Sequence, residues 1–353
     1  MFWPKKMRGN TSCKENALKK KNVLLIHTGG TLGMVEGKPD NHLKPAHIHE
    51  SVLKFVPELC ELAHLESAFA CNIDSANLDI PDMNTVLSTI RSNYEHFDGF
   101  VIIHGTDTMA YHASALSFMV ENNTKPIIFT GSQKPLRHIR TDARLNLVNS
   151  VEFATMSIPE VCICFNSTLF RGNRTRKVSI GQFEAFRSPN YPVLGSVGVD
   201  IHLNRKHLAD CSLEKTTFHE LGHSRIGVIK LYPGFDASAW IPCMLKSGVR
   251  AVVVEAYAAG NVPILTHSII PSISALTEAD VPVFIVSQAL EGSVDLDLYE
   301  CGQKAKQAGA IGCRDMTFEA VITKLYYLFS KFREIKSTKL VEEMLVNFSG
   351  EIS

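Results

Sequence analysis

Two segments rich in threonine and glycine carry the side chains best suited to chemistry. The first reads His-Thr-Gly-Gly-Thr-Leu-Gly over residues 27–33 and directly follows an apolar run. Its adjacent glycines let the backbone turn sharply, which leaves the Thr28 hydroxyl at the carboxyl end of a strand. The second reads His-Gly-Thr-Asp-Thr over residues 104–108, where Asp107 could bind an amino-acid ammonium while Thr106 faces a scissile group. Both segments are candidates for a site that acts on a small polar molecule.

Each segment also has a simpler interpretation. A dinucleotide-binding loop needs the pattern GxGxxG, and its three positions are occupied here by Thr28, Gly30 and Gly33, so the first glycine is a threonine. In the second segment, Thr106 or Asp107 could merely cap the helix that follows. The occurrence of two such turns after two strands of one sheet favours the chemical interpretation.

A third candidate is the cationic loop Arg-Gly-Asn-Arg-Thr-Arg-Lys over residues 171–177. It could be a solvated basic loop, or it could bind phosphate. In a hydrolase it could instead supply Lys177 as the base that takes a proton from a threonine. Without such a base, a threonine hydroxyl is a poor nucleophile.

The elements that must position these residues follow the pattern of a mainly parallel sheet. Short β-branched or aromatic runs alternate with longer helical patterns, which indicates βαβ units. The clearest predicted strands are Val23–His27, Phe100–His104, Pro126–Thr130 and Val161–Phe165. Because parallel strands present ligand-binding loops at their carboxyl ends, we expect the candidate segments to meet at one edge of the sheet.

The length of 353 residues and the distribution of these patterns predict two α/β domains. We place the larger, catalytic domain at residues 22–203 and a smaller α/β domain at residues 225–353. Periodicity disappears between residues 204 and 224, which we interpret as a linker. Residues 1–21 lack apolar periodicity and are predicted to be a solvated tail. A helix beginning near Asp315 has one apolar face, so we expect it to pack rather than to form a site, with Asp315 as its cap.

Composition excludes several classes of function. Apolar residues make up 45% of the chain and charged residues 20%, and the formal net charge is zero. The molecule as a whole therefore has no positive electrostatic field that would attract nucleic acid or an acidic membrane. We see neither a secretory signal nor a run of about 18 apolar residues, and so expect a cytoplasmic protein. The nine cysteines contain no CxxC pair and the 14 histidines no HExxH motif, so we expect reduced thiols and no metal.

Beyond these local patterns, the sequence resembles the L-asparaginases, which belong to the asparaginase/glutaminase family. Similar blocks occur in the family's order from about Asn22 to Leu328. They are TGGTLGM at 28–34, DGFVIIHGTDTMAY at 98–111, TGSQKP at 130–135, RGNRT at 171–175 and DMT at 315–317. The run ASALSFM at 113–119 resembles the cytoplasmic type I branch in particular. The resemblance implies a two-domain asparaginase-like fold.

The resemblance also implies an activity, the hydrolysis of L-asparagine to L-aspartate and ammonia without a cofactor. By similarity, Thr28 attacks the amide carbon and forms a β-aspartyl ester. Thr106, Asp107 and Lys177 match a second group, which handles proton transfer and the later attack of water.

Further residues are assigned to the substrate by the same resemblance. Asp74 and Ser75 match the loop that holds the α-amino and α-carboxylate groups, and Ser132 falls in the loop near the amide. Tyr299 resembles a tyrosine that other members bring into the site from the second domain. Because the family builds its sites at a dimer interface, usually within a dimer of dimers, we expect a homotetramer or a homodimer.

Three departures from the family pattern affect these expectations. Residues 35–46 contain no tyrosine, although many bacterial members carry one in this mobile loop. The family's Asp-Ser-Ser-Asp-Met is Asp-Ser-Ala-Asn-Leu at residues 74–78, which loses the second acid and leaves substrate affinity open. In some type I enzymes an effector asparagine lies beside an arginine, and Glu255 occupies that position here. This charge reversal puts the same regulation in doubt.

Two alternative functions stay open. The first is the asparaginase-like subunit of a tRNA-dependent amidotransferase, which delivers ammonia to a partner enzyme. Such subunits generally carry an extra N-terminal domain, whereas only about 21 residues precede the first predicted strand here. The second alternative is a catalytically weakened asparagine-binding protein. The presence of Thr28, Thr106, Asp107 and Lys177 together argues against it.

Overall fold

The computed structural model describes residues 20–30, 32, 52 and 54–353. The predicted tail, apart from its last two residues, and the loop at residues 35–46 therefore lie outside the described residues. In the part of the chain that is described, no helix is both long and apolar enough to cross a membrane.

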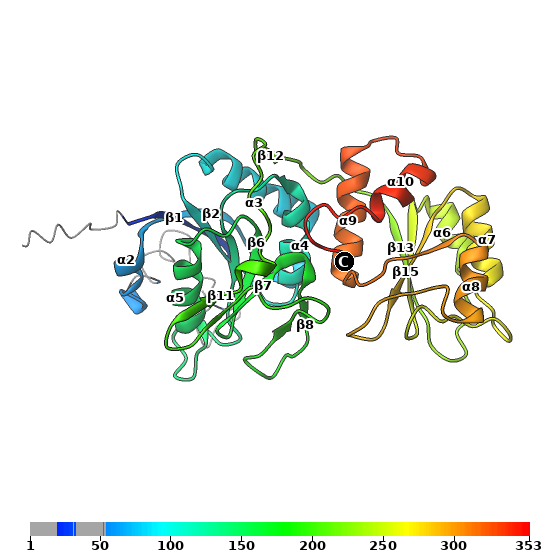
Figure 1. Cartoon of the computed structure of the whole chain (residues 1–353), viewed down its shortest axis with the longest axis horizontal. Coiled ribbons are helices and arrows are strands. Elements are labelled where there is room, and N and C mark those ends of the chain that lie inside the picture. The colour runs from blue at the N-terminus through cyan, green and yellow to red at the C-terminus, as the bar shows by residue number, and fades with distance from the viewer. Residues whose placement is uncertain (1–19, 31, 33–51, 53) are drawn as a thin grey trace, which may run out of the picture.

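A large eight-stranded sheet forms the first half of the molecule (Figure 1). Its strand order is β11-β10-β7-β6-β5-β3-β1-β2. The five strands from β6 to β2 run parallel, and β7, β10 and β11 are added antiparallel at one side. The strands are β1 (Asn22–Gly29), β2 (His64–Ile73), β3 (Gly99–Ile103), β5 (Ile127–Thr130), β6 (Val161–Phe165), β7 (Thr168–Arg171), β10 (Gly195–Val197) and β11 (Ile201–Leu203).

Helices cover both faces of this sheet because its central strands are apolar on both sides. In β1, Leu24 and Ile26 pack with α3 (Ile80–Asn93) and α4 (Met109–Met119). Val23 and Leu25 point to the other face, where they pack with α2 (Leu59–Leu62) and α5 (Ala143–Ala154). This alternation follows from the two-residue period of a strand. The continuous apolar runs in the sequence thus correspond to strands buried on both faces.

The smaller sheet contains four parallel strands in the order β13-β14-β15-β16. One face is covered by α6 (Ile241–Ser247), α7 (Ile270–Glu278) and α8 (Glu300–Gln307), which lie on the outer side of the molecule in Figure 1. The strands are β13 (Ile226–Lys230), β14 (Ala251–Ala256), β15 (Val283–Ser287) and β16 (Ala310–Gly312). The predicted fold class, a large mainly parallel sheet followed by a smaller α/β unit, is confirmed.

Helix α9 (Phe318–Lys331) lies between the two sheets, next to α4, and α10 (Ser337–Met344) packs beside it (Figure 1). One apolar cluster contains residues of α4 and α9 together with Val253 and Phe284 of the smaller sheet. Helix α9 is therefore a packing helix, as its apolar face predicted. Its predicted cap was wrong, because the Thr317 side chain accepts the hydrogen bond from the Ala320 N–H at 3.1 Å.

The segment predicted as a linker runs back along the larger sheet's helices. It includes the 3-10 turn η4 (Arg205–His207) and β12 (Thr217–Phe218), which pairs with β4 (Val120–Glu121). Beyond β12, the side chain of Asn84 in α3 hydrogen-bonds the backbone of Leu221 in both directions. The loss of periodicity in this segment reflects short pairings with distant elements.

Candidate active site

Three backbone turns meet at the carboxyl ends of β1, β2 and β3, and glycines make the approach possible. A Cβ atom on Gly30 would lie 2.6 Å from the Gly105 nitrogen, and one on Gly105 would lie 2.4 Å from the Ser75 Oγ. Gly29 and Gly30 also have φ angles of 104° and 86°, in the left-handed region that favours glycine. The Thr108 hydroxyl donates to the Ser75 carbonyl at 2.7 Å. The sequence therefore brings these turns together as predicted from their positions after strands.

The predicted Thr-Asp-Lys group is assembled at this edge. Lys177 Nζ lies 2.8 Å from Thr106 Oγ1 and 2.5 Å from Asp107 Oδ1. Thr106 is buried, whereas the Asp107 side chain is 59% exposed and the Lys177 side chain 15% exposed. The group therefore combines a sheltered hydroxyl with a carboxylate that is open to solvent. Such an arrangement can move a proton at Thr106 while Asp107 contacts a cationic ligand.

The strand that carries Lys177 is held in place by Arg174, which is 1% exposed. Lys177 ends β8 (Arg176–Lys177), which pairs with β9 (Phe186–Arg187). Just before β8, Arg174 donates to Asp315 Oδ2 at 2.8 Å and to the Gly350 carbonyl at 2.6 Å. Burial alone would raise the pKa of Asp315, but hydrogen bonds from the Ser353 N–H and Arg174 outweigh it and lower the pKa. The loop that carries Lys177 is thus anchored to residues that follow the smaller sheet.

Gln133 is a site residue that sequence reasoning missed. Its Oε1 lies 3.5 Å from the Thr106 hydroxyl, and its Nε2 donates to the carbonyls of Ser179 and Gln182 at 3.4 and 3.1 Å. Its own N–H is held by Asp142, at 2.9 Å from Oδ2. Gln133 therefore links Thr106 to the turn after Lys177. The signal was present in the TGSQKP block, although only Ser132 was selected from it.

Thr28 lies in a different environment from the one expected of an open nucleophile. Strand β1 continues to Gly29, two residues beyond the predicted strand, so Thr28 belongs to the sheet. Its side chain is 2% exposed, and its hydroxyl donates to the Ile103 carbonyl at 3.0 Å. The hydroxyl proton is therefore used inside the structure. The other threonine of this sequence segment, Thr31, lies outside the described residues.

The predicted substrate-binding residues occupy two places. Asp74 is exposed at the start of the 3-10 turn η2 (Ser75–Asn77), where its side chain accepts from the Ala76 N–H at 3.0 Å, and Ser75 is buried beside it. Ser132 is buried, and its hydroxyl has no hydrogen-bond partner among the described residues. Both serines lie in loops at the edge that carries Thr106.

Tyr299 is set apart from this group within the chain. It precedes α8 on the outer side of the smaller sheet and is 51% exposed. Among the described residues, no hydrogen bond or ring contact joins its side chain to the other predicted site residues. Its assignment stays a prediction.

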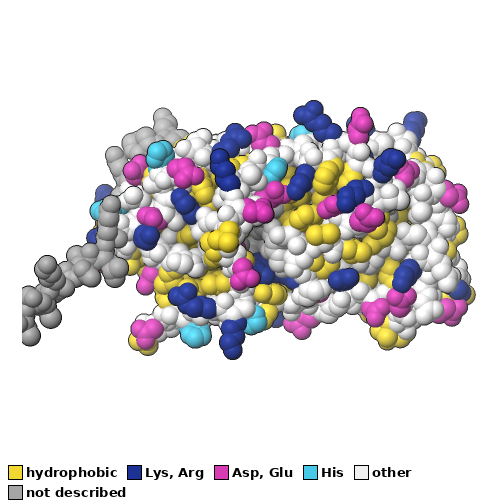
Figure 2. All heavy atoms as spheres, turned by 45° about the horizontal axis from the view of Figure 1, so that its top comes forward, with side chains coloured by type: hydrophobic (Ala, Val, Ile, Leu, Met, Phe, Trp, Pro, Cys, Tyr) yellow, Lys and Arg dark blue, Asp and Glu magenta, His cyan; other side chains and the backbone are white. Residues whose placement is uncertain are grey.

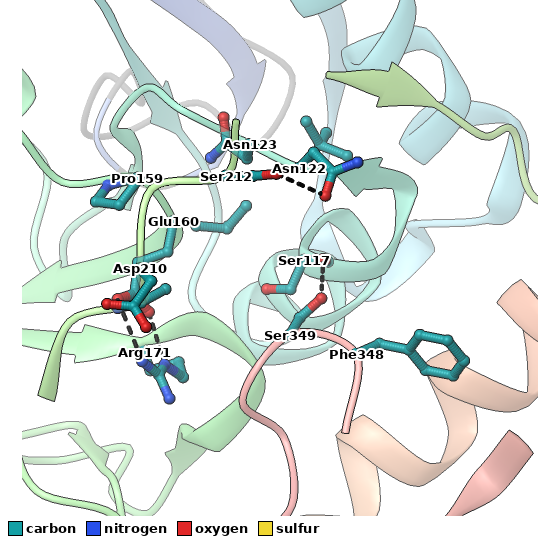
Figure 3. Close-up of a pocket in the computed structure, with 13 residues that line it drawn as sticks. Ser117, Asn122, Asn123, Pro159, Glu160, Arg171, Asp210, Ser212, Phe348 and Ser349 are labelled. Atoms are coloured by element: carbon teal, nitrogen blue, oxygen red, sulfur yellow. Dashed lines mark hydrogen bonds and ion pairs between the residues drawn. The ribbon is translucent and has the colours of Figure 1, made fainter. Parts of the chain in front are cut away.

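A cavity of about 150 Å³ lies elsewhere, beside the start of β6 (Figure 3). Several of its polar groups are already paired: Arg171 Nε donates to Glu160 Oε2 at 2.6 Å, and Ser349 donates to the Ser117 carbonyl at 2.7 Å. The start of a parallel strand is opposite to the edge that carries Thr106. This cavity is therefore separate from the candidate active site. In the described part of the chain, no group of three or more His, Cys, Asp or Glu side chains is placed to hold a metal ion.

Comparison with known proteins covers almost the whole chain. The family model described as "Asparaginase, N-terminal" matches residues 22–209, and the model described as "Glutaminase/Asparaginase C-terminal domain" matches residues 225–341. The chain is 35% identical to L-asparaginase 1 of Escherichia coli K12, over 95% of this chain and 99% of that protein. The family resemblance seen in the sequence is confirmed.

Two further similarities are informative. The crystal structure of L-asparaginase I from Vibrio cholerae superposes with a TM-score of 0.85 at 34% identity, covering 95% of this chain and 99% of that one. A component of the glutamyl-tRNA(Gln) amidotransferase of Pyrococcus abyssi is 31% identical, over 94% of this chain and 76% of that protein.

Proposed function

This chain belongs to the asparaginase family, and from that premise we propose that it is an L-asparaginase, hydrolysing the side-chain amide of L-asparagine in the cytoplasm. The products are L-aspartate and ammonia. The proposal includes weak activity on glutamine, whose side-chain amide would be hydrolysed by the same reaction. The single observation that carries the proposal is the contact of Lys177 Nζ with both Thr106 Oγ1 and Asp107 Oδ1.

The chemistry runs in two steps through an ester. A threonine oxygen of the 28–31 turn bonds to the amide carbon, and its proton passes to the Lys177–Thr106 pair. The carbon–nitrogen bond then breaks, the nitrogen takes up a proton, and ammonia leaves. Water attacks the resulting β-aspartyl ester with Thr106 and Lys177 as its base, which restores the threonine hydroxyl and releases aspartate. An ester intermediate divides a difficult hydrolysis into two easier reactions.

The charges of the site suit an amino-acid substrate. The exposed Asp107 and Asp74 carboxylates can receive the α-ammonium group, while the buried hydroxyls of Ser75 and Ser132 offer hydrogen bonds to the carboxylate and the amide. On the face drawn in Figure 2, cationic and anionic side chains are interspersed, with no extended area of one sign. A small zwitterionic substrate is consistent with this mixed surface.

Two threonines that lie three residues apart in the sequence are candidates for the nucleophile. Thr28 is the residue that the resemblance indicates, but its hydroxyl is buried and bonded to the Ile103 carbonyl. Because the Thr28 hydroxyl is engaged in this way, we take Thr31 as the second candidate for the nucleophile. Peptide mapping of the acid-quenched ester intermediate would identify the modified threonine. An ester on Thr31, with Thr28→Ser retaining most of the activity, would assign Thr28 a supporting role.

We further propose that the site is completed by a second copy of the chain. Large apolar side chains are exposed beside Lys177, with Ile180 at 90% and Phe183 at 41%. Others are exposed near the carboxyl ends of the smaller sheet, namely Tyr232, Leu265, Leu298 and Tyr299. Pairing these areas in a homodimer, and dimers in a homotetramer, would bury them and bring Tyr299 of the partner subunit to the site.

The amidotransferase interpretation is supported to a similar degree by similarity, since the archaeal amidotransferase component matches over 94% of this chain. Both functions use the same hydrolysis of a side-chain amide, and they differ in whether ammonia is released or delivered to a partner enzyme. A weakened asparagine-binding protein would keep the substrate loops without turnover. Activity of the isolated chain separates the three.

The test is ammonia release by purified protein with L-asparagine, L-glutamine and D-asparagine. We expect release from L-asparagine that is lost in Thr106→Val and kept in Thr89→Val, a control in helix α3. Release only in the presence of a partner enzyme would favour the amidotransferase function. Binding of asparagine without any release would favour the binding protein.

A further inference from the structure

Two buried histidines lie directly beneath the Thr106 turn. His104 follows β3 and is 2% exposed, and His112, in the first turn of α4, is fully buried. His104 Nδ1 lies 2.6 Å from the Gly105 carbonyl oxygen, and His112 Nδ1 lies 3.0 Å from His104 Nε2. Both rings also pack edge-on against Phe129, with centroid distances of 5.8 and 5.1 Å. The proposed mechanism gives neither histidine a role.

The hydrogen bonds fix the tautomer of each ring. Burial lowers the pKa of His104 to about 4 and that of His112 well below its usual value, so both are neutral near pH 7. A carbonyl oxygen only accepts, so the proton of His104 is on Nδ1 and its Nε2 is an acceptor. His112 must then donate through Nδ1, which leaves an acceptor at its Nε2, without a hydrogen-bond partner among the described residues. The pair is a directed chain of donors that ends at the Gly105 carbonyl.

Holding this carbonyl also sets the direction of the next N–H group. A peptide unit is planar, and in the trans form the C=O of one residue and the N–H of the next point in opposite directions. No cis peptide bond occurs in the described part of the chain. With the Gly105 carbonyl held toward His104, the Thr106 N–H therefore points away from the histidines.

That N–H group is available for a ligand. Thr106 is 7% exposed, yet its N–H donates to no group among the described residues. A buried N–H without a partner is rare, because it loses its hydrogen bond to water without replacing it. The backbone here is closely packed, since a Cβ on Gly105 would lie 2.4 Å from Ser75 Oγ and one on Gly30 2.6 Å from the Gly105 nitrogen.

We propose that His104 and His112 are positioning residues that hold the Gly105–Thr106 peptide so that the Thr106 N–H faces the carbonyl oxygen of the scissile amide. This inference rests on the proposed amide hydrolysis. As the threonine attacks, negative charge develops on that oxygen and is stabilised by the fixed N–H donor. A donor of this kind acts mainly in the transition state, so its loss lowers kcat more than it changes substrate binding.

Two variants of His112 test the inference. His112→Leu removes the donor to His104, whereas the Nδ2 of His112→Asn occupies nearly the place of the imidazole Nδ1 and retains it. Removing one oxyanion donor outright typically lowers kcat by about 10² to 10³, and misorienting it forfeits part of that effect. We expect kcat to fall by roughly tenfold or more in the leucine variant, with KM within about twofold, and the asparagine variant to recover most of the loss.

Crystal structures of the two variants give a measurement that does not depend on turnover. We expect the Gly105–Thr106 peptide to be rotated in the leucine variant and unchanged in the asparagine variant. Equal kcat in all three proteins, equal losses in both variants, or an unrotated peptide in the leucine variant would overturn the proposed role. A wild-type protein without activity would instead overturn the proposed function, while the structures would still test how the peptide is held.

Discussion

Lys177 and Lys324 each pair with a carboxylate, yet the two ion pairs lie in opposite environments. Lys324 and Glu351 are both fully buried, with the Lys324 ammonium 2.6 Å from Glu351 Oε1 and 2.9 Å from the Met344 carbonyl, and a third contact to the Val346 carbonyl. Lys177 uses two contacts, and its partner Asp107 is largely exposed. A lysine with all its hydrogens committed can only support structure. One with an uncommitted hydrogen beside a buried hydroxyl can take part in chemistry.

The largest effect that would sharpen this comparison is expected from Lys177→Met. It removes the group that exchanges a proton with Thr106, and positioned acid–base groups contribute about 10² to 10⁴ in rate. We expect a fall in kcat of that size with a nearly unchanged melting temperature. Steady-state ammonia release and thermal unfolding measure the two quantities. A variant that unfolds readily would show that Lys177 also supports the structure and would break the contrast.

Lys324→Met should give the opposite result. It leaves the buried Glu351 carboxylate without its cation, and breaking a buried pair typically costs about 3–5 kcal/mol of unfolding free energy. We expect a loss of that size in urea denaturation, with kcat retained at temperatures where the variant is folded. Lys339→Met, which removes a half-exposed ammonium that pairs with Glu343, is a control that should lower stability far less. A large loss of kcat in folded Lys324→Met would contradict the assignment.

Acid should destabilise the protein through His104 and His112. Their pKa values are lowered in the folded state, so the unfolded chain binds more protons as the pH falls below about 6.5. The contribution of these two histidines to the free energy of unfolding is therefore fully present above that pH. It is lost as the pH falls toward 4, by about 3 kcal/mol for His104 alone. Denaturation at a series of pH values measures the slope. In His112→Asn the slope should be shallower, and an identical slope would mean that His112 is not a buried neutral group.

We expect the smallest effect from a substitution at Gly30, where its backbone approaches that of Gly105. Gly30→Ala would place a Cβ 2.6 Å from the Gly105 nitrogen in a backbone conformation with φ of 86°. Such strain costs about 1–3 kcal/mol, and any relaxation displaces the turn before Thr106. We expect lower stability together with a lower kcat. Gly198→Ala, which has no atom closer than 3.9 Å to the added Cβ, should change neither.

The parts that sequence could predict are those that depend on local pattern. Apolar runs located the central strands, and their order placed Thr106 and Asp107 at the same edge of the sheet as the 28–31 turn. The cationic loop offered Lys177 as a base, and the resemblance grouped it with Thr106, which lies 71 residues away in sequence yet contacts it.

Side-chain contacts between segments that are distant in sequence could not be predicted from local patterns. Nothing local predicts that Arg174 binds Asp315, or that His112 donates to His104. The burial of Thr28 was missed because β1 runs two residues farther than its apolar run. Pairing with β2 decides this boundary, since Gly29 pairs with Ile73, whereas the pairing with β3 ends at His27. Asp315 was taken for a cap because carboxylates favour helix starts, but the buried Arg174 guanidinium binds it instead.

The anchoring of Arg174 by Gly350 has a consequence for the order in which the molecule can form. These residues are 176 positions apart, so the loop that carries Lys177 is completed only after the smaller sheet and α9 have docked. If the larger domain folded first, its sheet could form, but Lys177 would not yet be fixed in position beside Thr106. Activity during refolding should therefore appear with the last cooperative event and should not precede it.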